Sequence, residues 1–334
     1  MKTMNRKEWL QQLELVQPGL STKELIEQST CFVFEKGFVK TFNDEIACTL
    51  ACDIGIEGAV QAKPLLELLK KLPEETVEVQ LGDKQLLIQG EHRKAGIRME
   101  SEVFLDTEQI ETPKEDAWIP LPPDFCEAVE VVRQTASQND SEFVLTCVHI
   151  HPEYVEACNN YQATRFPLKM KVSSSILVRH TSMLHVGSLG IMDFAEDSSW
   201  LHFRNPMGLV ISCRKYEDEF PDMGEILNVS GDPITLPSDI EGAASTAQIF
   251  SMDNPYDDQI QITISRNKLR LKGTGENGWY SETKKLEYDG PKIQFRIAPK
   301  LLKEITKRQH DCEITRDRLK IDGGTFIYVT ALNT

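Results

Sequence analysis

Two histidines near the middle of this 334-residue sequence are the residues best placed to do chemistry. His149 and His151 flank Ile150 in a strand-like run, so both imidazoles lie on one face of the strand, with Glu153 nearby. Imidazole and carboxylate groups bind zinc and other divalent metals, which would suit a metal-dependent enzyme. No third ligand follows at a convincing spacing. Two histidines on a surface strand are therefore favoured over a metal site.

A second stretch, Gly273-Thr274-Gly275-Glu276-Asn277-Gly278, has the glycine content of a phosphate-binding loop. It lacks the Lys-Ser or Lys-Thr ending of such loops and lies between β-type segments, so we predict a hairpin loop. The 8 cysteines are scattered without a CxxC pair, which predicts buried thiols in a reducing compartment. The sequence thus indicates no metal, no cofactor and no catalytic residue.

Length and composition predict a soluble globular protein of two or three domains. Apolar residues make up 40% of the chain and charged residues 27%. No apolar run approaches the roughly 20 residues that cross a bilayer. The charged start, Met1 to Lys7, is not followed by the apolar core of a signal peptide. We expect a cytoplasmic protein without a membrane partner.

The net charge is −15, which argues against a protein that coats itself with phosphate contacts. Nucleic-acid binding then requires that lysine and arginine side chains gather on one surface.

Internal similarity indicates how the chain is organised. Ile119-Pro120-Leu121-Pro122-Pro123-Asp124-Phe125 and Ile234-Thr235-Leu236-Pro237-Ser238-Asp239-Ile240 share the phrase I-x-L-P-x-D-apolar, about one third of the chain apart. Proline near a helix start does no harm, because its missing N–H has no helical partner there. An amphipathic helix is predicted after each phrase, and a matching helix from Trp9 to Val16 opens the chain.

A second unit, a helix followed by two strands, recurs three times. Its copies are a helix at 64–72 with strands at 77–81 and 86–88, a helix at 174–184 with strands at 189–194 and 200–203, and a helix at 299–306 with strands at 312–315 and 319–321. The fold class is therefore α+β, with two helices on antiparallel sheets in each third. Linker-like composition predicts domains at 1–115, 116–230 and 231–334.

Three phrases then match a known family in order and spacing. Phe220-Pro221-Asp222-Met223 resembles an F-P-D-Y phrase, Ala157 to Ala163 occupies the place of an A-T-D-G-H-R-L loop, and Tyr328 to Leu332 that of a Y-V-V-M-P tail. With the repeat, these phrases make the chain similar to the beta sliding clamp of bacterial replication, as a divergent member. The resemblance implies three domains of one topology, closing as a head-to-tail dimeric ring round duplex DNA. It implies no catalysis, but processivity for a polymerase.

The resemblance also implies roles for particular residues. Lysine and arginine side chains on exposed helix faces would contact DNA without reading its sequence. The predicted residues are Lys63, Lys70, Lys71, Arg133, Arg179, Lys300, Lys303, Lys307 and Arg308, and Arg6 and Lys7 are expected to add to them. The first helix of the third domain carries only the acids Asp239 and Glu241. At the dimer interface we expect Ile97, Met99, Ile249 and Phe250.

Polymerase and clamp loader are expected to bind through short linear peptides in an apolar groove. The predicted groove residues are Cys158, Asn160, Tyr161, Gln162, Ala163, Pro221, Ile226, Arg296, Pro299, Val329, Thr330, Ala331 and Leu332. Because Asn160-Tyr161-Gln162-Ala163 replaces Gly-His-Arg-Leu, the groove is expected to recognise a different peptide. The alternative is a protein-binding scaffold of the same architecture that is not loaded on DNA.

Overall fold

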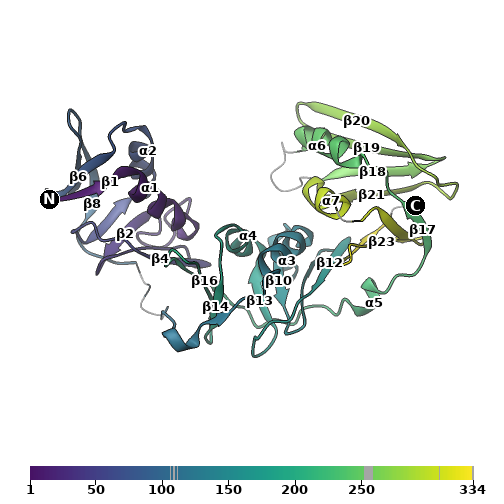
Figure 1. Ribbon diagram of the computed structural model, residues 1–334, viewed down its shortest axis with the longest axis horizontal. Helices are drawn as coiled ribbons and strands as arrows, with labels where there is room; N and C mark the ends of the chain where they lie inside the picture. The colour runs from purple at the N-terminus through teal and green to yellow at the C-terminus, as the bar shows by residue number, and fades with distance from the viewer. Residues whose placement is uncertain (106, 108–109, 111, 252–258, 308, 333–334) are drawn as a thin grey trace. The chain divides into compact units, whose positions relative to one another are not determined.

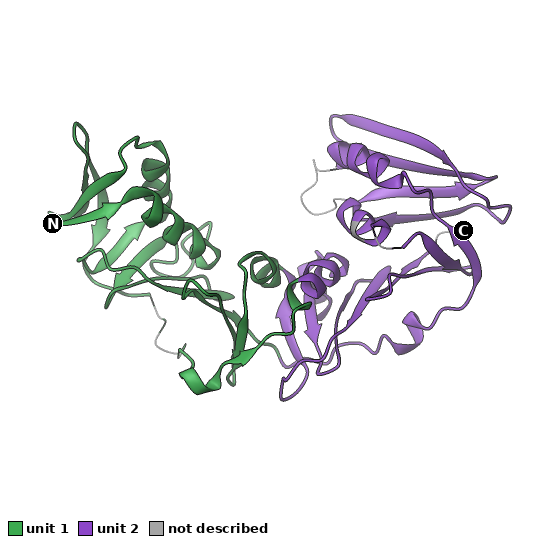
Figure 2. Cartoon of the chain, in the orientation of Figure 1, with its two compact units in different colours: residues 1–126, 181–216 green, residues 127–180, 217–334 purple. Residues whose placement is uncertain are grey.

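The structure is a computed structural model that describes residues 1–105, 107, 110, 112–251, 259–307 and 309–332. The chain forms two compact units (Figure 2). Unit 1 contains residues 1–126 and 181–216, and unit 2 contains residues 127–180 and 217–334. Both consist of antiparallel sheets with helices packed on them, so the predicted α+β class is confirmed.

The same order of elements occurs three times: a strand, a helix, four strands, a helix and three strands (Figure 1). The first repeat has β1 (Lys2–Asn5), α1 (Arg6–Leu15), β2 (Cys31–Glu35), β3 (Phe38–Phe42), β4 (Ile46–Ala51), β5 (Gly58–Gln61), α2 (Ala62–Lys71), β6 (Thr76–Gly82), β7 (Gln85–Gln89) and β8 (Lys94–Glu100). The second has β9 (Ile119–Pro120), α3 (Phe125–Val132), β10 (Cys147–Ile150), β11 (Tyr154–Cys158), β12 (Gln162–Pro167), β13 (Ile176–Arg179), α4 (His180–Ser188), β14 (Asp193–Glu196), β15 (Trp200–Arg204) and β16 (Val210–Arg214). The third has β17 (Asp232–Thr235), α6 (Ile240–Ser251), β18 (Ile260–Ser265), β19 (Lys268–Gly275), β20 (Gly278–Lys285), β21 (Ile293–Ile297), α7 (Pro299–Thr306), β22 (Asp311–Ile314), β23 (Arg318–Asp322) and β24 (Ile327–Ala331). Connecting segments add η1 (Gln17–Gly19), η2 (Glu115–Ala117), η3 (Arg133–Thr135), η4 (Asp140–Thr146) and α5 (Gly224–Leu227).

Strand pairing repeats as faithfully as element order. The first strand joins the last three in the orders β1-β6-β7-β8, β9-β14-β15-β16 and β17-β22-β23-β24. The middle four pair in the orders β5-β2-β3-β4, β13-β10-β11-β12 and β21-β18-β19-β20. The threefold repeat read from the sequence is therefore present in the hydrogen-bonded register. The domain limits after residues 115 and 230 stay a prediction, because the two compact units divide the chain elsewhere.

Two further pairings join one repeat to the next. In unit 1, β16 pairs with β4, with Ser212 opposite Ala47. In unit 2, β24 pairs with β12, with Val329 opposite Ala163. In both, the last strand of one repeat meets the third of the four middle strands of the repeat before it. We call these two pairings junctions. Among the described residues, two strands have no junction partner: β8, the last strand of the first repeat, and β20, the third middle strand of the third repeat.

The free edges of β8 and β20 follow from the pairing among the described residues. On one side of β8 lies β7, and on the other β5 pairs only with Met99 and Glu100. The residues of β8 from Lys94 to Arg98 thus have a strand on one side only. At the end of its four-stranded sheet, β20 pairs with β19 alone.

Amphipathic sequence explains the helices. In α1, the Asn5 side chain caps the start by accepting from the N–H groups of Lys7 and Glu8, and Trp9 and Leu13 are fully buried. In α7, Pro299 occupies the first turn, where a missing N–H costs nothing. Both helices thus begin at a local signal and bury one face.

One predicted helix is wrong in position. The segment predicted as helix 174–184 contains β13, and α4 begins only at His180. Ile176, Leu177 and Val178 are buried, and they pair with β10, so sheet pairing determines their conformation. The strand predicted at 189–194 likewise begins at Asp193, after a turn in which Gly190 has φ of 62°.

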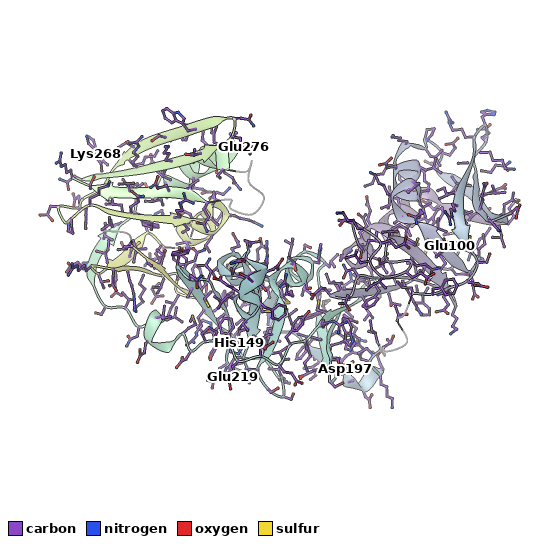
Figure 3. All side chains as sticks on the ribbon, turned by 180° about the vertical axis from the view of Figure 1, so that it is seen from behind. Glu100, His149, Asp197, Glu219, Lys268 and Glu276 are labelled. Atoms are coloured by element: carbon purple, nitrogen blue, oxygen red, sulfur yellow. The ribbon has the colours of Figure 1, made fainter. Side chains whose placement is uncertain are left out.

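The glycine-rich stretch is confirmed as a hairpin turn. It joins β19 to β20 with Gly275 opposite Gly278, so Glu276 lies at one end of the hairpin and Lys268 at the other (Figure 3).

Gly273 and Gly242 provide a matched test of packing between α6 and β19. A Cβ on Gly273 would collide with the backbone of Ala247, whereas a Cβ on Gly242 would meet open space. We predict that Gly273→Ala lowers the free energy of unfolding by about 2 kcal/mol. Gly242→Ala should raise it by about 0.5–1 kcal/mol, because alanine favours helix. Urea unfolding of both variants measures this, and equal effects would contradict the close approach.

Candidate nucleic-acid interface and partner site

The predicted cations on α2 share one helix face. Lys63 and Lys70 are seven residues apart, so they lie on the same side, and both are exposed, as is Lys71. Leu65 and Leu69, on the opposite side, are fully buried. The predicted separation of a basic from an apolar face is therefore present in α2.

The same arrangement occurs at α7. Lys300, Lys303 and Lys307 follow the helical spacing, with Lys300 and Lys307 exposed, whereas Leu301, Leu302 and Ile305 are buried. Arg308 lies outside the described residues.

Acidic neighbours already neutralise several of these cations. Lys70 pairs with Glu14 of α1 at 2.9 Å. Glu130 of α3 pairs with both Lys300 and Arg133, the latter at 2.7 Å. Burial opposes the charged form of Glu130, but the hydrogen bonds from Lys300 and Arg133 prevail, and the pKa of Glu130 lies below its ordinary value. Glu130 is therefore a shared counter-ion for Lys300 of α7 and Arg133.

The two remaining arginines have structural partners. Arg179 is half-buried and binds Asp140 at 2.5 Å and the Thr146 hydroxyl at 2.7 Å. Arg6 donates to the carbonyl oxygens of Leu69 and Glu74, each at 2.7 Å, and so caps the C-terminal end of α2. Part of the predicted basic set thus stabilises the fold itself.

The predicted partner groove divides into an apolar part and a polar part. In the apolar part, Cys158, Ala163 and Val329 are buried against Met223, Leu227 and Val229 of the segment that leads to β17. We call this connecting segment, residues 217–231, the linker. The chain's own linker therefore covers the apolar wall that we expected to be open to a partner. Leu332 and Pro299 are also buried, whereas Pro221 and Ile226 remain exposed on the linker.

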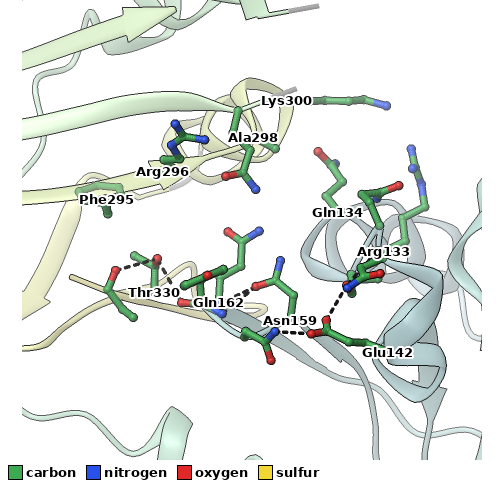
Figure 4. A pocket seen from close by; sticks show the side chains of 18 residues that line it. Arg133, Gln134, Glu142, Asn159, Gln162, Phe295, Arg296, Ala298, Lys300 and Thr330 are labelled. Carbon is green, nitrogen blue, oxygen red and sulfur yellow. Dashed lines mark hydrogen bonds between the residues drawn. The ribbon is translucent and has the colours of Figure 1, made fainter. Parts of the chain in front are cut away.

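The polar part is open. Asn160, Tyr161, Gln162, Arg296, Thr330 and Ala331 line a cavity of about 920 Å³ within unit 2 (Figure 4). Arg133 and Lys300, which we expected at the DNA interface, line it too. We call it the polar cavity.

Sequence reasoning missed ten of the eighteen residues that line the polar cavity, Gln134, Glu142 and Asn159 among them. Asn159 directly follows β11, and its side chain accepts from the N–H groups of Tyr161 and Gln162 at 2.9 and 3.0 Å. An asparagine just after a strand is a turn signal that predicts this loop. No such signal marks Glu142.

The predicted interface residues lie in different settings. Ile97 and Met99 are buried within unit 1, so their side chains support β8 from inside and are not available on the surface. Ile249, at the end of α6, is 66% exposed, and Phe250 stacks on Tyr280 of β20. Trp279 of β20, which we did not predict, is 63% exposed. Exposed apolar side chains thus accompany the free edge of β20.

Solved structures of other proteins share this arrangement of elements. The DNA polymerase III beta subunit of Thermotoga maritima matches with a TM-score of 0.75 at 15% identity, over 99% of this chain and 98% of that chain. A putative DNA polymerase III beta subunit from Eubacterium rectale matches with a TM-score of 0.75 at 16% identity, over 99% of both chains. The DNA polymerase sliding clamp of Bacillus subtilis matches with a TM-score of 0.72 at 13% identity, over 99% of this chain and 98% of that chain.

This chain has the sliding-clamp fold. No protein-family model matches its sequence, and no curated protein does. Within the described residues, no helix is long and apolar enough to span a membrane.

The metal-enzyme alternative finds no support in this clamp fold. His149 is buried, and its Nδ1 lies 2.8 Å from Glu156, which Arg165 also binds at 2.7 Å. His151 stacks on Tyr154. Among the described residues, no group of three or more His, Cys, Asp and Glu side chains is arranged to hold a metal ion. Both histidines are engaged in packing the sheet.

A Ser-His-Asp arrangement occurs where none was predicted. His202 lies 2.7 Å from the Ser212 hydroxyl through Nδ1 and 2.9 Å from Asp197 through Nε2. Ser212 is only 4% exposed and His202 only 1%, so a substrate has no access to the hydroxyl. All three residues lie on or beside β15 and β16, and the bonds fix the strand that forms the unit 1 junction.

His202 makes the stability of this region depend on pH. Burial lowers its pKa despite the opposing hydrogen bond that the imidazole makes to the Asp197 carboxylate. The unfolded chain therefore binds more protons as pH falls through about 6.5, and stability declines there. We predict that His202→Asn is less stable than wild type at pH 8 but loses less stability between pH 8 and pH 5.5.

Urea unfolding at the two pH values measures the effect. His92→Asn serves as control, because His92 is a surface residue whose imidazole lies beside the Glu91 carboxylate. An identical pH dependence in wild type and His202→Asn would contradict the assignment.

Proposed function

We propose that this chain is a cytoplasmic DNA sliding clamp that closes as a homodimeric ring round duplex DNA and tethers a replicative polymerase. The observation that carries the proposal is the strand pairing at the junctions. Each junction pairs the last strand of one repeat with the third middle strand of the repeat before it. Within the described part of the chain, β8 and β20 have no such partner.

The leftover strands suggest how two chains associate. Strand β8 has the same place in its repeat as β16 and β24, and β20 has the same place as β4 and β12. We therefore expect the β8 edge of one copy to pair with the β20 edge of another. Pairing them would be head-to-tail, and two copies would close a ring of six repeats. A long exposed strand edge promotes aggregation unless it is paired, so closure also removes a liability.

Electrostatics support a sequence-independent hold on DNA. With a net charge of −15, most of the surface repels a polyanion. The lysines of α2 and α7 lie on exposed faces away from the apolar cores, and long-range attraction to phosphates needs no base contact. A ring lined by such helices would slide because it makes few fixed contacts.

Partner proteins would reach the clamp at the polar cavity. It contains six of the predicted groove residues, and a cavity of about 920 Å³ accepts part of a peptide. Polymerase and clamp loader, each through a short linear segment, are the proposed occupants.

Retention on circular DNA tests the proposal against the scaffold alternative. Protein loaded by a clamp loader on nicked circular duplex should stay bound through gel filtration and be lost when the circle is cut. Equal loss from circular and linear DNA would support a scaffold that is not loaded.

We predict that the double variant Ile249→Asp, Trp279→Asp is monomeric. Buried carboxylates are tolerated poorly where apolar side chains meet, so the two aspartates should prevent association. The wild type should have twice the 37.9 kDa chain mass by light scattering. Leu25→Asp, at a residue 90% exposed in unit 1, should leave the mass unchanged. A monomeric wild type, or a dimeric double variant, would contradict closure through β20.

We predict that Glu130→Gln binds duplex DNA more tightly than wild type, because it releases Lys300 and Arg133 for phosphate contacts. The slope of log affinity against log salt should steepen by about 1–2. Glu313→Gln makes the same charge change beside Lys320 of β23 and serves as control. Equal gains in both variants would indicate a general charge effect and rule out a local role for Glu130.

A further inference from the structure

Lysine and arginine side chains gather on one face of the four-stranded sheet formed by β18 to β21. Lys268, Arg270 and Lys272 are alternate residues of β19, so their side chains lie on the same face. Strand register places Lys285 of β20 directly opposite Lys268 on that face. Lys272 is half-buried, and the other three are exposed. We call the face that these four residues share the basic face.

The other face of this sheet packs against α6. Leu269 and Leu271 alternate with the cations of β19 and are fully buried. Lys284 of β20 points to this inner side, where it pairs with Asp239, just before α6, at 2.7 Å and with Glu282 at 2.6 Å. Helix α7 packs against α6. The basic face is therefore on the opposite side of the sheet from α6, and it is separate from the lysines of α7.

The cations of the basic face have uncharged neighbours. Among the described residues none of the four forms an ion pair, in contrast to Lys284. Arg270 donates to the Ser281 hydroxyl at 2.7 Å, and Nζ of Lys272 lies 6.0 Å from the centre of the Trp279 ring. Positive charge is thus left unneutralised here, in a chain of net charge −15.

Acidic residues are kept off this face. Glu282 is the one acid within β18 to β21, and it is opposite the buried Leu271, so it points to the inner side. Glu276 lies in the turn at the far end of the hairpin from Lys268 (Figure 3). The outward face of the four strands therefore carries no carboxylate.

Stability of the sheet does not account for this arrangement. Lys268 and Lys285 are directly opposite each other, and like charges in that relation destabilise a pair of strands. Lysine on an edge strand prevents unwanted strand pairing, but β19 is paired on both sides, with β18 and β20. A cluster that costs the fold free energy without protecting an edge is typical of a binding surface.

The geometry indicates an extended polyanion as the ligand. Successive cations along β19 are about 6.8 Å apart, because each residue of a strand advances by about 3.4 Å. Ser281 and Thr283 of β20 lie on the same face and add hydroxyl groups that donate to phosphate oxygens.

Trp279 distinguishes nucleic acid from an acidic protein segment. Its ring is 63% exposed at the Lys272 end of the face, where a base can stack on it. An acidic protein segment would need several apolar anchors, and Trp279 is the one apolar side chain that these strands present outward. Stacking also requires an unpaired base, which a single strand offers and a duplex does not.

We propose that the basic face binds single-stranded nucleic acid, with phosphates on Lys268, Arg270, Lys272 and Lys285 and one base stacked on Trp279. The inference goes beyond the proposed function, because the helix lysines, not this face, are expected to contact the encircled duplex. The chain would then hold a single strand and a duplex at different surfaces.

Fluorescence anisotropy on the full-length protein tests the inference with a labelled oligothymidylate of about 16 nucleotides, the upper site size of single-strand-binding domains. The triple variant Lys268→Gln, Arg270→Gln, Lys272→Gln should weaken binding about tenfold or more. It should also reduce the slope of log affinity against log salt by about 2, since each phosphate contact on a single strand contributes about 0.7.

A matched variant controls for net charge. Lys23→Gln, Lys169→Gln, Lys171→Gln removes the same charge from exposed lysines elsewhere and should bind the oligomer like wild type. Thermal unfolding and solution mass confirm that both triple variants are folded. An abasic oligomer of the same length should bind wild type at least about fivefold more weakly, because it cannot stack on Trp279.

Four results would overturn the inference: no binding of oligothymidylate, an equal loss in the two triple variants, equal binding of the abasic oligomer, or tighter binding of a polyglutamate peptide of the same charge. Failure of retention on circular DNA would instead refute the clamp function, and the anisotropy measurements would still decide the role of the basic face.

Discussion

Backbone pairing between repeats is the interaction on which the rest of this molecule depends. At β4 with β16 and at β12 with β24, main-chain hydrogen bonds connect one repeat to the next without any particular side chain. Side chains then secure each junction locally: His202 binds Ser212 in unit 1, and Tyr328 binds Gln162 in unit 2. Because the backbone provides the connection, the fold survives at 13–16% identity to solved clamps.

A chain of net charge −15 can hold DNA only if attraction is local and moderate. Glu14 pairs with Lys70 of α2 and Glu130 pairs with Lys300 of α7, so the two glutamates partly neutralise the positive charge of these helices. Under the proposed function, this balance suits sliding, since strong phosphate pairs would pin the ring to one place. The same acids contribute to packing between neighbouring helices, so stability and DNA affinity are linked through them.

Sequence reasoning found the elements that depend on local pattern. The I-x-L-P-x-D phrases marked the starts of α3 and α6, and alternating apolar residues marked β6, β7 and β23. It failed where tertiary pairing decides: Ile176 to Val178 entered a sheet, and Met223 and Leu227 covered the wall expected to bind a partner. The hydrogen bond between Gln162 and Tyr328 could not be foreseen, because the two residues are 166 positions apart.

Hydrogen exchange at the two leftover strands tests most directly whether the junction pairing also closes two chains. Amides of β8 from Lys94 to Arg98 and outward-facing amides of β20 should gain protection together as protein concentration rises through the dimerisation range, while the junctions stay protected throughout. Rapid exchange at both edges in a sample that is fully dimeric would contradict the account.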